Sequence, residues 1–159
     1  MKLQLIVFGK LKVPGLRDSA DHYVTGIERW ASFSEIEIRP ESIPNKLPET
    51  KRAIREREST RILDRVPPRT PLILLDETGE TLPSVEWARK IDGLMRTGAP
   101  TISIAIGGSL GFSDEIRTRA TAILSLGKQT LSHELARVVA LEQLYRSLSI
   151  LKGHPYHNA

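Results

Sequence analysis

The chain has 159 residues, of which 40% are hydrophobic and 26% charged, a composition typical of a globular protein with a real core. It has no cysteine, which excludes disulfides, zinc–thiolate sites and thiol nucleophiles. The apolar run at the N-terminus is too short for a signal peptide, and no stretch approaches the roughly 18 apolar residues of a membrane span. We therefore expect a cytoplasmic protein without a membrane partner, organised as a single domain over residues 1–159.

The net charge of +4 lies entirely in the first 70 residues, which hold fourteen basic and ten acidic side chains. Residues 51–69 alone carry seven basic and three acidic side chains. Such a segment is compatible with a nucleic-acid backbone as partner. It is equally compatible with a solvated helix whose charges form ion pairs, and both interpretations stay open.

Strands and helices are predicted to alternate in the first 70 residues. A buried strand is expected over residues 3–8, and apolar residues at helical spacing predict an amphipathic helix from Pro14 to about Ser32. Residues 36–38 predict a second strand. A charged helix is expected from Glu49 to about Val66, where two prolines follow.

The alternation becomes more regular after residue 70. Apolar strands are predicted over residues 71–76, 101–106 and 122–126, with a turn at 77–80. Three serines precede helical patterns and are predicted to cap them: Ser84, Ser113 and Ser132. Fully apolar strands that alternate with helices predict an α/β fold with a mainly parallel sheet flanked by helices.

Three predicted strands end in segments suited to binding a ligand, because ligands of open α/β sheets bind at the carboxyl ends of the strands. These segments are residues 75–79, 106–111 and 126–131. Each contains glycine, which lets the backbone approach a ligand closely. None of them is a Rossmann or Walker sequence, so the spacing alone does not identify the ligand.

The last helix and the tail behind it form the most informative part of the chain. The helix after Ser132 is apolar with few charges, and the tail Gly153-His-Pro-Tyr-His157 follows it directly. A helix of this kind must be buried on most sides, and a polar tail attached to it is positioned rather than loose. This arrangement suits a site assembled at the C-terminus of the chain.

These motifs together resemble the RlmH family, also called the YbeA family, of the SPOUT superfamily. The resemblance spans almost the whole chain and rests on residues 1–5, 106–111, 124–133, 137–146 and 154–157. It implies an α/β-knot fold with a C-terminal trefoil knot, which is very rare among proteins. It also implies a homodimer. A two-fold interface would cover the apolar residues that lie on several faces of the last helix, namely Leu135, Val138, Val139, Leu141, Leu144, Tyr145, Leu148 and Leu151.

The resemblance further implies methylation of N3 of a pseudouridine in 23S rRNA, at position 1915 in helix 69, on assembled ribosomes. The methyl donor would be S-adenosyl-L-methionine, bound in the knot. Backbone groups would hold its adenine, with apolar side chains on the two faces of the ring. Relatives often carry a bulkier residue at Gly127, which puts only a side-chain contact there in doubt. The implied cofactor contacts are Leu75, Gly107, Leu126, Gly127, Lys128, Gln129, Thr130 and Leu131.

Three residues are candidates for catalysis. Arg137 would provide a positive field and hold a phosphate or a base carbonyl, unless it only pairs with Glu134 or Glu142 on its own helix. His154 would accept the proton from N3, and Tyr156 would stack on a splayed base. The two tail imidazoles suit zinc by residue type, but no third ligand is near them in the sequence, so we expect no metal.

Two other functions stay open at this point. One is a ribosome-binding protein without catalytic activity, which would have no reason to keep three strand-end segments compatible with adenosine. The other is a SPOUT methyltransferase with another RNA substrate, such as a tRNA ribose. The residues 154–157 disfavour the tRNA enzyme, because that class usually has a different C-terminal knot sequence.

Overall fold

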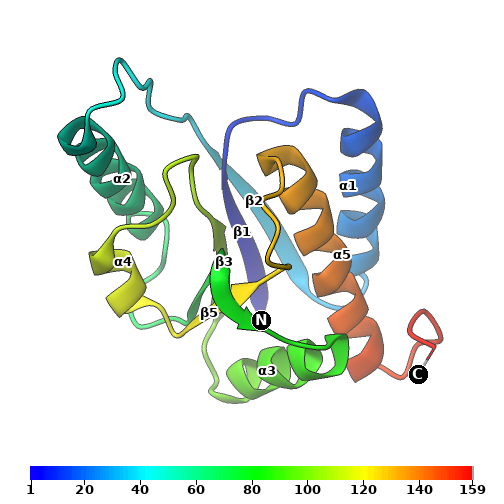
Figure 1. The fold of residues 1–159 in the computed structure, drawn as a ribbon. Helices are drawn as coiled ribbons and strands as arrows, with labels where there is room; N and C mark the ends of the chain where they lie inside the picture. The colour runs from blue at the N-terminus through cyan, green and yellow to red at the C-terminus, as the bar shows by residue number, and fades with distance from the viewer. Residues whose placement is uncertain (159) are drawn as a thin grey trace.

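The computed structural model describes residues 1–158 and contains a five-stranded, all-parallel sheet with the strand order β2-β1-β4-β3-β5 (Figure 1). This confirms the predicted α/β fold with a parallel sheet flanked by helices. The strands are β1 (Lys2–Phe8), β2 (Ser32–Ile38), β3 (Leu72–Thr81), β4 (Thr101–Ile106) and β5 (Ala122–Ser125). The helices are α1 (Pro14–Glu28), α2 (Pro48–Leu63), α3 (Ser84–Arg96), α4 (Asp114–Arg119) and α5 (His133–Leu151).

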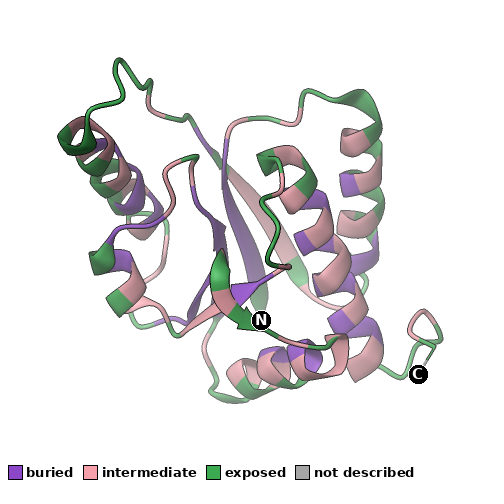
Figure 2. Cartoon of the chain, in the orientation of Figure 1, coloured by how far each residue is buried: buried purple, intermediate pink, exposed green. Residues whose placement is uncertain are grey.

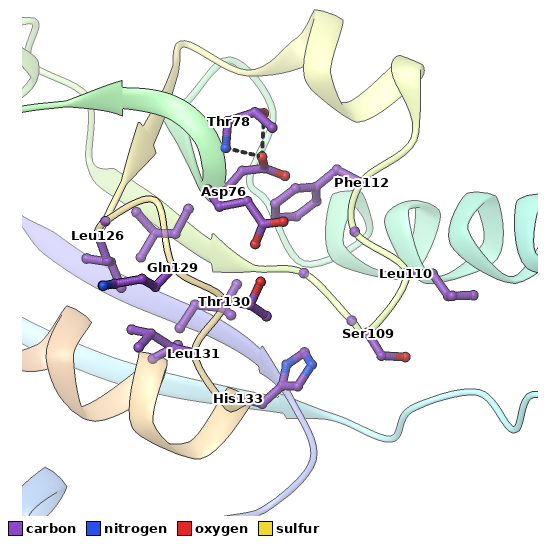
Figure 3. Close-up of a pocket in the computed structure, with 18 of the residues that line it drawn as sticks. Asp76, Thr78, Ser109, Leu110, Phe112, Leu126, Gln129, Thr130, Leu131 and His133 are labelled. Atoms are coloured by element: carbon purple, nitrogen blue, oxygen red, sulfur yellow. Dashed lines mark hydrogen bonds between the residues drawn. The ribbon is translucent and has the colours of Figure 1, made fainter.

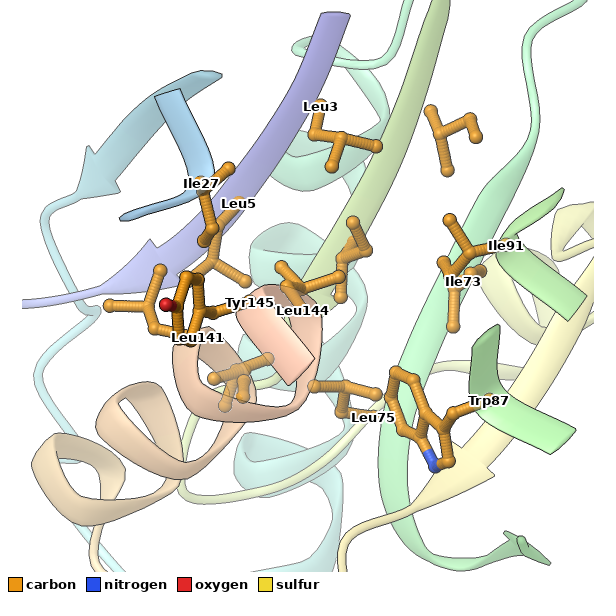
Figure 4. Close-up of a cluster of buried hydrophobic side chains, with 14 of the residues drawn as sticks. Leu3, Leu5, Ile27, Ile73, Leu75, Trp87, Ile91, Leu141, Leu144 and Tyr145 are labelled. Carbon is orange, nitrogen blue, oxygen red and sulfur yellow. The ribbon is translucent and has the colours of Figure 1, made fainter. Parts of the chain in front are cut away.

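The helices cover the two faces of the sheet separately, and each face has its own core (Figures 1 and 2). Successive side chains of a strand point to opposite faces, so Leu3 and Leu5 of β1 join one core and Ile6 and Phe8 the other. Leu3 and Leu5 pack with side chains of α1, α3 and α5, as Figure 4 shows for Ile27, Trp87 and Leu144. Side chains of α2 and α4 cover the opposite face. Both faces of the central strands are therefore buried, which explains their fully apolar sequences.

The first helix is shorter and the second strand longer than the sequence predicts. Helix α1 ends at Glu28, and β2 begins at Ser32 instead of Ile36. Strand β2 pairs with β1 along its whole length, from Lys2 opposite Ser32 to Phe8 opposite Ile38. The ladder with β1 therefore determines where β2 begins, and this information is absent from the local sequence.

The turn predicted at residues 77–80 is wrong, because β3 continues to Thr81. Strand β3 pairs with β5 twice, with a register shift between Leu75 and Glu80, so that both residues lie opposite Leu124. Gly79 makes this close crossing possible. A Cβ atom at Gly79 would lie 2.7 Å from the backbone carbon of Leu124 and 2.8 Å from that of Ile123.

The structure confirms one of the three predicted serine caps in full. Ser132 is the N-cap of α5, and its hydroxyl accepts a hydrogen bond from the Leu135 amide. Ser113 is at the N-cap of α4, but its side chain makes no capping bond. The cap predicted at Ser84 is wrong, because Pro83 is the N-cap of α3 and the Ser84 hydroxyl bonds to Gln143.

Helix α5 is buried within a single chain, which removes most of the sequence argument for a dimer. Five of its apolar residues are at most 9% exposed, because α1 and α3 pack against it: Val138, Leu141, Leu144, Tyr145 and Leu148. Only Leu135, at 39% exposed, presents a large apolar side chain to solvent. The homodimer and the trefoil knot stay predictions. None of the helices within residues 1–158 is both long enough and apolar enough to span a membrane.

Candidate functional site

The main pocket of the described chain opens at the carboxyl ends of β4 and β5 and beside the middle of β3 (Figure 3). Its volume of about 540 Å³ is within the range of small-molecule and cofactor sites. Residues 75–78, 106–112 and 126–131 supply most of its walls, and the start of α5 closes one side. The three strand-end segments that the sequence singles out thus come together in one cavity, as expected for an open α/β sheet.

Seven of the eight predicted cofactor contacts line this pocket. The exception is Lys128, whose side chain is exposed and does not contribute to the wall. The leucines among the seven give an apolar surface suited to the faces of an adenine ring. The lining residues that the sequence predicts are Leu75, Gly107, Leu126, Gly127, Gln129, Thr130 and Leu131.

Two glycines shape the pocket wall. A Cβ atom at Gly107 would lie 3.2 Å from the Phe112 ring, so the loop packs tightly against its own aromatic residue. Gly127 has a φ of 148°, which side chains rarely allow. The turn at Gly127 is fixed by Ser125, whose hydroxyl donates to the Gly127 carbonyl at 2.7 Å and accepts from the Gly127 amide at 3.0 Å. These contacts prearrange the backbone that a ligand would meet.

Asp76 places a carboxylate at the pocket between β3 and α4. One oxygen accepts hydrogen bonds from the Thr78 amide at 2.9 Å and the Thr78 hydroxyl at 2.5 Å, and the other accepts from Arg117 at 2.7 Å. Burial raises the pKa of Asp76, but the bonds from Thr78 and Arg117 outweigh it and hold that pKa below its usual value. The carboxylate therefore stays charged and ties the middle of β3 to α4.

We expect the Asp76→Ala variant to lose about 2 kcal/mol of unfolding free energy at neutral pH, because two charge-assisted bonding partners are left unpaired. The pKa of Asp76 is lowered in the folded state, so its contribution is complete above the unfolded pKa and is lost as the pH falls through the folded pKa. Urea unfolding of wild type and variant, from pH 7 to about pH 2, measures this difference. Asp92→Ala breaks an exposed pair with Arg96 and is the control, with an expected loss below about 0.5 kcal/mol.

Arg137 is not among the residues that line the pocket, and it is already paired. Its side chain is 4% exposed, and it donates to Glu35 at 2.5 Å and to Glu37 at 2.8 Å, both on β2. It does not pair with Glu134 or Glu142, the partners on its own helix that the sequence offers. The proposed positive field of Arg137 at a target base stays a prediction. The negative charges of Glu35 and Glu37 would weaken that field.

The tail containing His154 and Tyr156 packs at the far end of α5 from the pocket. His133, the first residue of α5, lines the pocket, and the 19 residues of the helix span about 28 Å. The chain turns back after α5, and the ring of His154 lies 5.4 Å from that of Trp30. The tail is positioned, as the sequence predicts, but none of its described residues lines the pocket of its own chain.

Tyr156 is held by contacts with α5. Its hydroxyl donates to Glu142 at 3.0 Å, its ring centroid lies 4.5 Å from that of Tyr145, and the guanidinium carbon of Arg146 lies over the ring, 4.7 Å from its centroid. Burial raises the pKa of the Tyr156 phenol, and the hydrogen bonds with Tyr23 and Glu142 raise it further. The phenol is neutral at physiological pH, so Tyr156 can donate a hydrogen bond or stack but cannot accept a proton.

The basic segment 51–69 is partly neutralised. Arg52 pairs with Glu56, while Arg57 and Arg61 both approach Glu41 in the loop before α2. Three of its seven basic side chains thus form ion pairs, which supports the solvated-helix interpretation for these three.

Sequence reasoning missed several residues at the site. Arg117 and Phe112 line the pocket, yet neither follows a strand directly, and no local pattern marks them. Asp76 is the last residue of the strand predicted over residues 71–76, and a carboxylate at that strand end was the available signal. His133 is not among the three catalytic candidates named from the sequence, but its imidazole is the one that lines the cavity (Figure 3).

Comparisons with known proteins agree with this geometry. The chain matches the family model described as "Predicted SPOUT methyltransferase" over residues 1–157. A protein of Maridesulfovibrio salexigens named ribosomal RNA large subunit methyltransferase H is 40% identical over 157 residues, or 99% of this chain and 98% of the relative. A protein of Streptococcus pneumoniae with the same name is 38% identical over 158 residues, 99% of each chain. The chain therefore belongs to the RlmH family of SPOUT methyltransferases.

Proposed function

We propose that this protein transfers a methyl group from S-adenosyl-L-methionine to N3 of pseudouridine 1915 in helix 69 of 23S rRNA. The observation that carries the proposal is the meeting of three strand-end segments in one pocket of cofactor size. The names of the relatives support rRNA of the large subunit as the substrate. We further propose that the protein acts in the cytoplasm on assembled ribosomes, and that residues 1–159 fold as one knotted domain.

The pocket suits S-adenosyl-L-methionine by its shape and lining. Leu75, Leu126 and Leu131 would enclose the adenine, and the backbone around Gly107 and Gly127 can approach it closely. When bound, this cofactor supplies a methyl group already activated on a sulfonium. The pocket residues would hold that methyl group in line with the target nitrogen, and such alignment accounts for much of the rate of two-substrate reactions.

N3 of the base carries a proton, which must be removed for the nitrogen to attack the methyl group. Each unit by which the N3 pKa exceeds the ambient pH costs about 1.4 kcal/mol in the population of the reactive anion. We propose His154 as the proton acceptor and Tyr156 as the aromatic surface on which the base stacks. His133 is the alternative acceptor, because it lines the pocket within its own chain.

The position of the tail supports a homodimer. His154 and Tyr156 lie at the end of a helix about 28 Å long whose other end closes the pocket. They can reach a target base only at the pocket of a second copy. We therefore propose that the tail of each protomer completes the site of its partner, and that a single chain is inactive.

The methyl-transfer assay is the direct test. Labelled S-adenosyl-L-methionine would be incubated with ribosomes that have or lack pseudouridine in helix 69, and with separated rRNA. We expect label only in large-subunit rRNA of pseudouridine-bearing ribosomes. Label in another RNA would contradict the substrate, and cofactor binding without transfer to any RNA would favour a different substrate. Absence of both would favour a ribosome-binding protein without activity.

Mixing two inactive variants tests the completion of the site by the partner. His154→Ala/Tyr156→Ala removes the tail groups, and Leu131→Arg fills the pocket. If each tail serves the partner's pocket, a mixed dimer has one intact site, and activity should return after the variants are unfolded and refolded together. If each tail served its own pocket, no mixed dimer would have an intact site. An inactive mixture would therefore contradict the proposal.

We also expect weak binding to the isolated helix 69 hairpin. Three arginines of the basic segment are held in ion pairs, and the net charge of +4 is small for an RNA enzyme. Affinity would then come from a larger ribosomal surface. Filter binding at several salt concentrations measures this, and tight, salt-insensitive binding to the hairpin would contradict the expectation.

A further inference from the structure

One buried carboxyl group has no role in the site described above. Glu58 of α2 is 4% exposed. Its Oε1 atom accepts a hydrogen bond from the Glu41 amide at 3.0 Å, while its Oε2 atom is buried and has no hydrogen-bond partner among the described residues. Burying a carboxyl oxygen without a hydrogen-bond partner costs free energy of folding. The presence of Glu58 at this buried position therefore needs an explanation.

The unpartnered oxygen lies directly against the wall of the pocket. A Cβ atom at Gly108 would be 2.0 Å from Oε2 of Glu58, well inside the contact distance of the two atoms. Gly108 itself lines the pocket. Its φ is not positive, so the backbone conformation does not require glycine at this position. The three atoms nearest to this Cβ position all belong to the Glu58 carboxyl group, so a side chain at Gly108 would have to displace that group.

The next residue of α2 contacts the other end of the same loop. The Ser59 hydroxyl accepts a hydrogen bond from the Ser113 amide at 2.9 Å, and both serines are buried. Between these two contacts, the Gly111 amide donates to the Gly108 carbonyl at 3.0 Å and closes a tight turn. Two consecutive residues of α2 thus support the loop 108–113 at both ends, from the side opposite the pocket.

We propose that Glu58 is a positioning residue for the cofactor: its carboxyl group fixes the loop 108–113 in the shape that binds S-adenosyl-L-methionine, and glycine at position 108 leaves room for that group. This inference rests on the proposed cofactor. The carboxyl group acts through the loop and touches neither substrate. The hydrogen bond from the Glu41 amide holds it in place.

Four variants test the proposal. Glu58→Ala removes the support, and Gly108→Ala introduces the atom that collides with it. The double variant Glu58→Ala/Gly108→Ala removes the collision. Glu56→Ala, which loses only an exposed pair with Arg52 on the same helix, is the matched control. Calorimetric titration with S-adenosyl-L-methionine gives the affinities, and hydrogen exchange of the 108–113 amides without ligand reports the loop directly.

We expect each single variant to weaken cofactor binding roughly tenfold, with a raised KM for the cofactor and an unchanged kcat. The double variant should bind no more weakly than the worse single variant, because its two changes act on one contact. Amides of the loop should exchange faster in Glu58→Ala, and Glu56→Ala should match wild type. Losses that multiply to roughly a hundredfold in the double variant, or wild-type affinity in Glu58→Ala, would overturn the proposal.

The two proposals fail in different ways. If the wild-type protein does not bind S-adenosyl-L-methionine, the proposed cofactor is wrong, whatever Glu58 does. The exchange of the loop amides then still decides the role of Glu58. Unchanged exchange in Glu58→Ala would show that the loop does not depend on this residue.

Discussion

Replacing Arg137 with alanine is expected to lower the free energy of unfolding by about 3 kcal/mol, because it leaves Glu35 without a partner and Glu37 with only the partly exposed Arg17. The Arg137 side chain is 4% exposed, and the side chains of Glu35 and Glu37 are 15% and 29% exposed. Because the two carboxylates are partly exposed, the expected loss is at the low end of the range for buried ion pairs. Chemical denaturation at pH 7 measures it. Arg137→Lys should lose nearly as much, since an ammonium group cannot reproduce the two-pronged geometry.

The effect of Arg137→Ala should depend on pH. Burial raises the pKa of Glu37, but hydrogen bonds and charges from Arg137 and Arg17 outweigh it, and the folded pKa lies below its usual value. The stabilisation is therefore present above the unfolded pKa and disappears as the pH falls through the folded one. Arg52→Ala, which breaks an exposed pair, is the control. A variant as stable as this control, yet inactive, would indicate that Arg137 acts in catalysis and not in folding.

Gly79→Ala is expected to damage both stability and cofactor binding. The new Cβ atom would lie within 2.8 Å of the β5 backbone, and backbone atoms cannot move aside as a flexible side chain can. We expect a loss of about 3 kcal/mol and at least a roughly tenfold weaker affinity for S-adenosyl-L-methionine. The affinity falls because the pocket residue Leu75 lies on β3 and Leu126 directly follows β5, and these two strands would be forced apart.

Gly93→Ala provides the matched control for that experiment. Gly93 lies inside α3 with nothing within 4 Å of its would-be Cβ atom, so alanine should stabilise the protein by up to about 1 kcal/mol. Thermal unfolding and calorimetric titration of both variants measure the two effects. Equal melting temperatures for the two variants would show that the crossing of β3 and β5 is looser than the structure indicates.

The sequence predicts the pocket better than it predicts the chemistry beside it. Each segment lining the pocket follows an apolar strand, and parallel strands bring their carboxyl ends to the same edge of the sheet. This rule for parallel strands applies whatever their order in the sheet. The partners of Arg137 could not be predicted in this way, because Glu35 and Glu37 are about a hundred residues away and only the folded sheet brings them near.

The errors in the fold share one cause. The turn expected at residues 77–80 and the late start expected for β2 both reflect local patterns that tertiary pairing overrides. The dimer itself stays a prediction, but the apolar pattern of α5 is weak evidence for it, for a related reason. The apolar faces of α5 suggest a missing partner, but α1 and α3 from the same chain cover most of them. Such coverage depends on packing between distant elements, which no periodicity reveals.

The measurement that tests the account most directly is calorimetric titration of the purified protein with S-adenosyl-L-methionine. We expect binding by wild type, at least a roughly tenfold loss in Leu131→Arg, which fills the pocket, and no change in Ile43→Arg, which lies on an exposed loop. Absence of binding by wild type, or equal affinity in Leu131→Arg, would contradict the assignment of this pocket to the methyl donor.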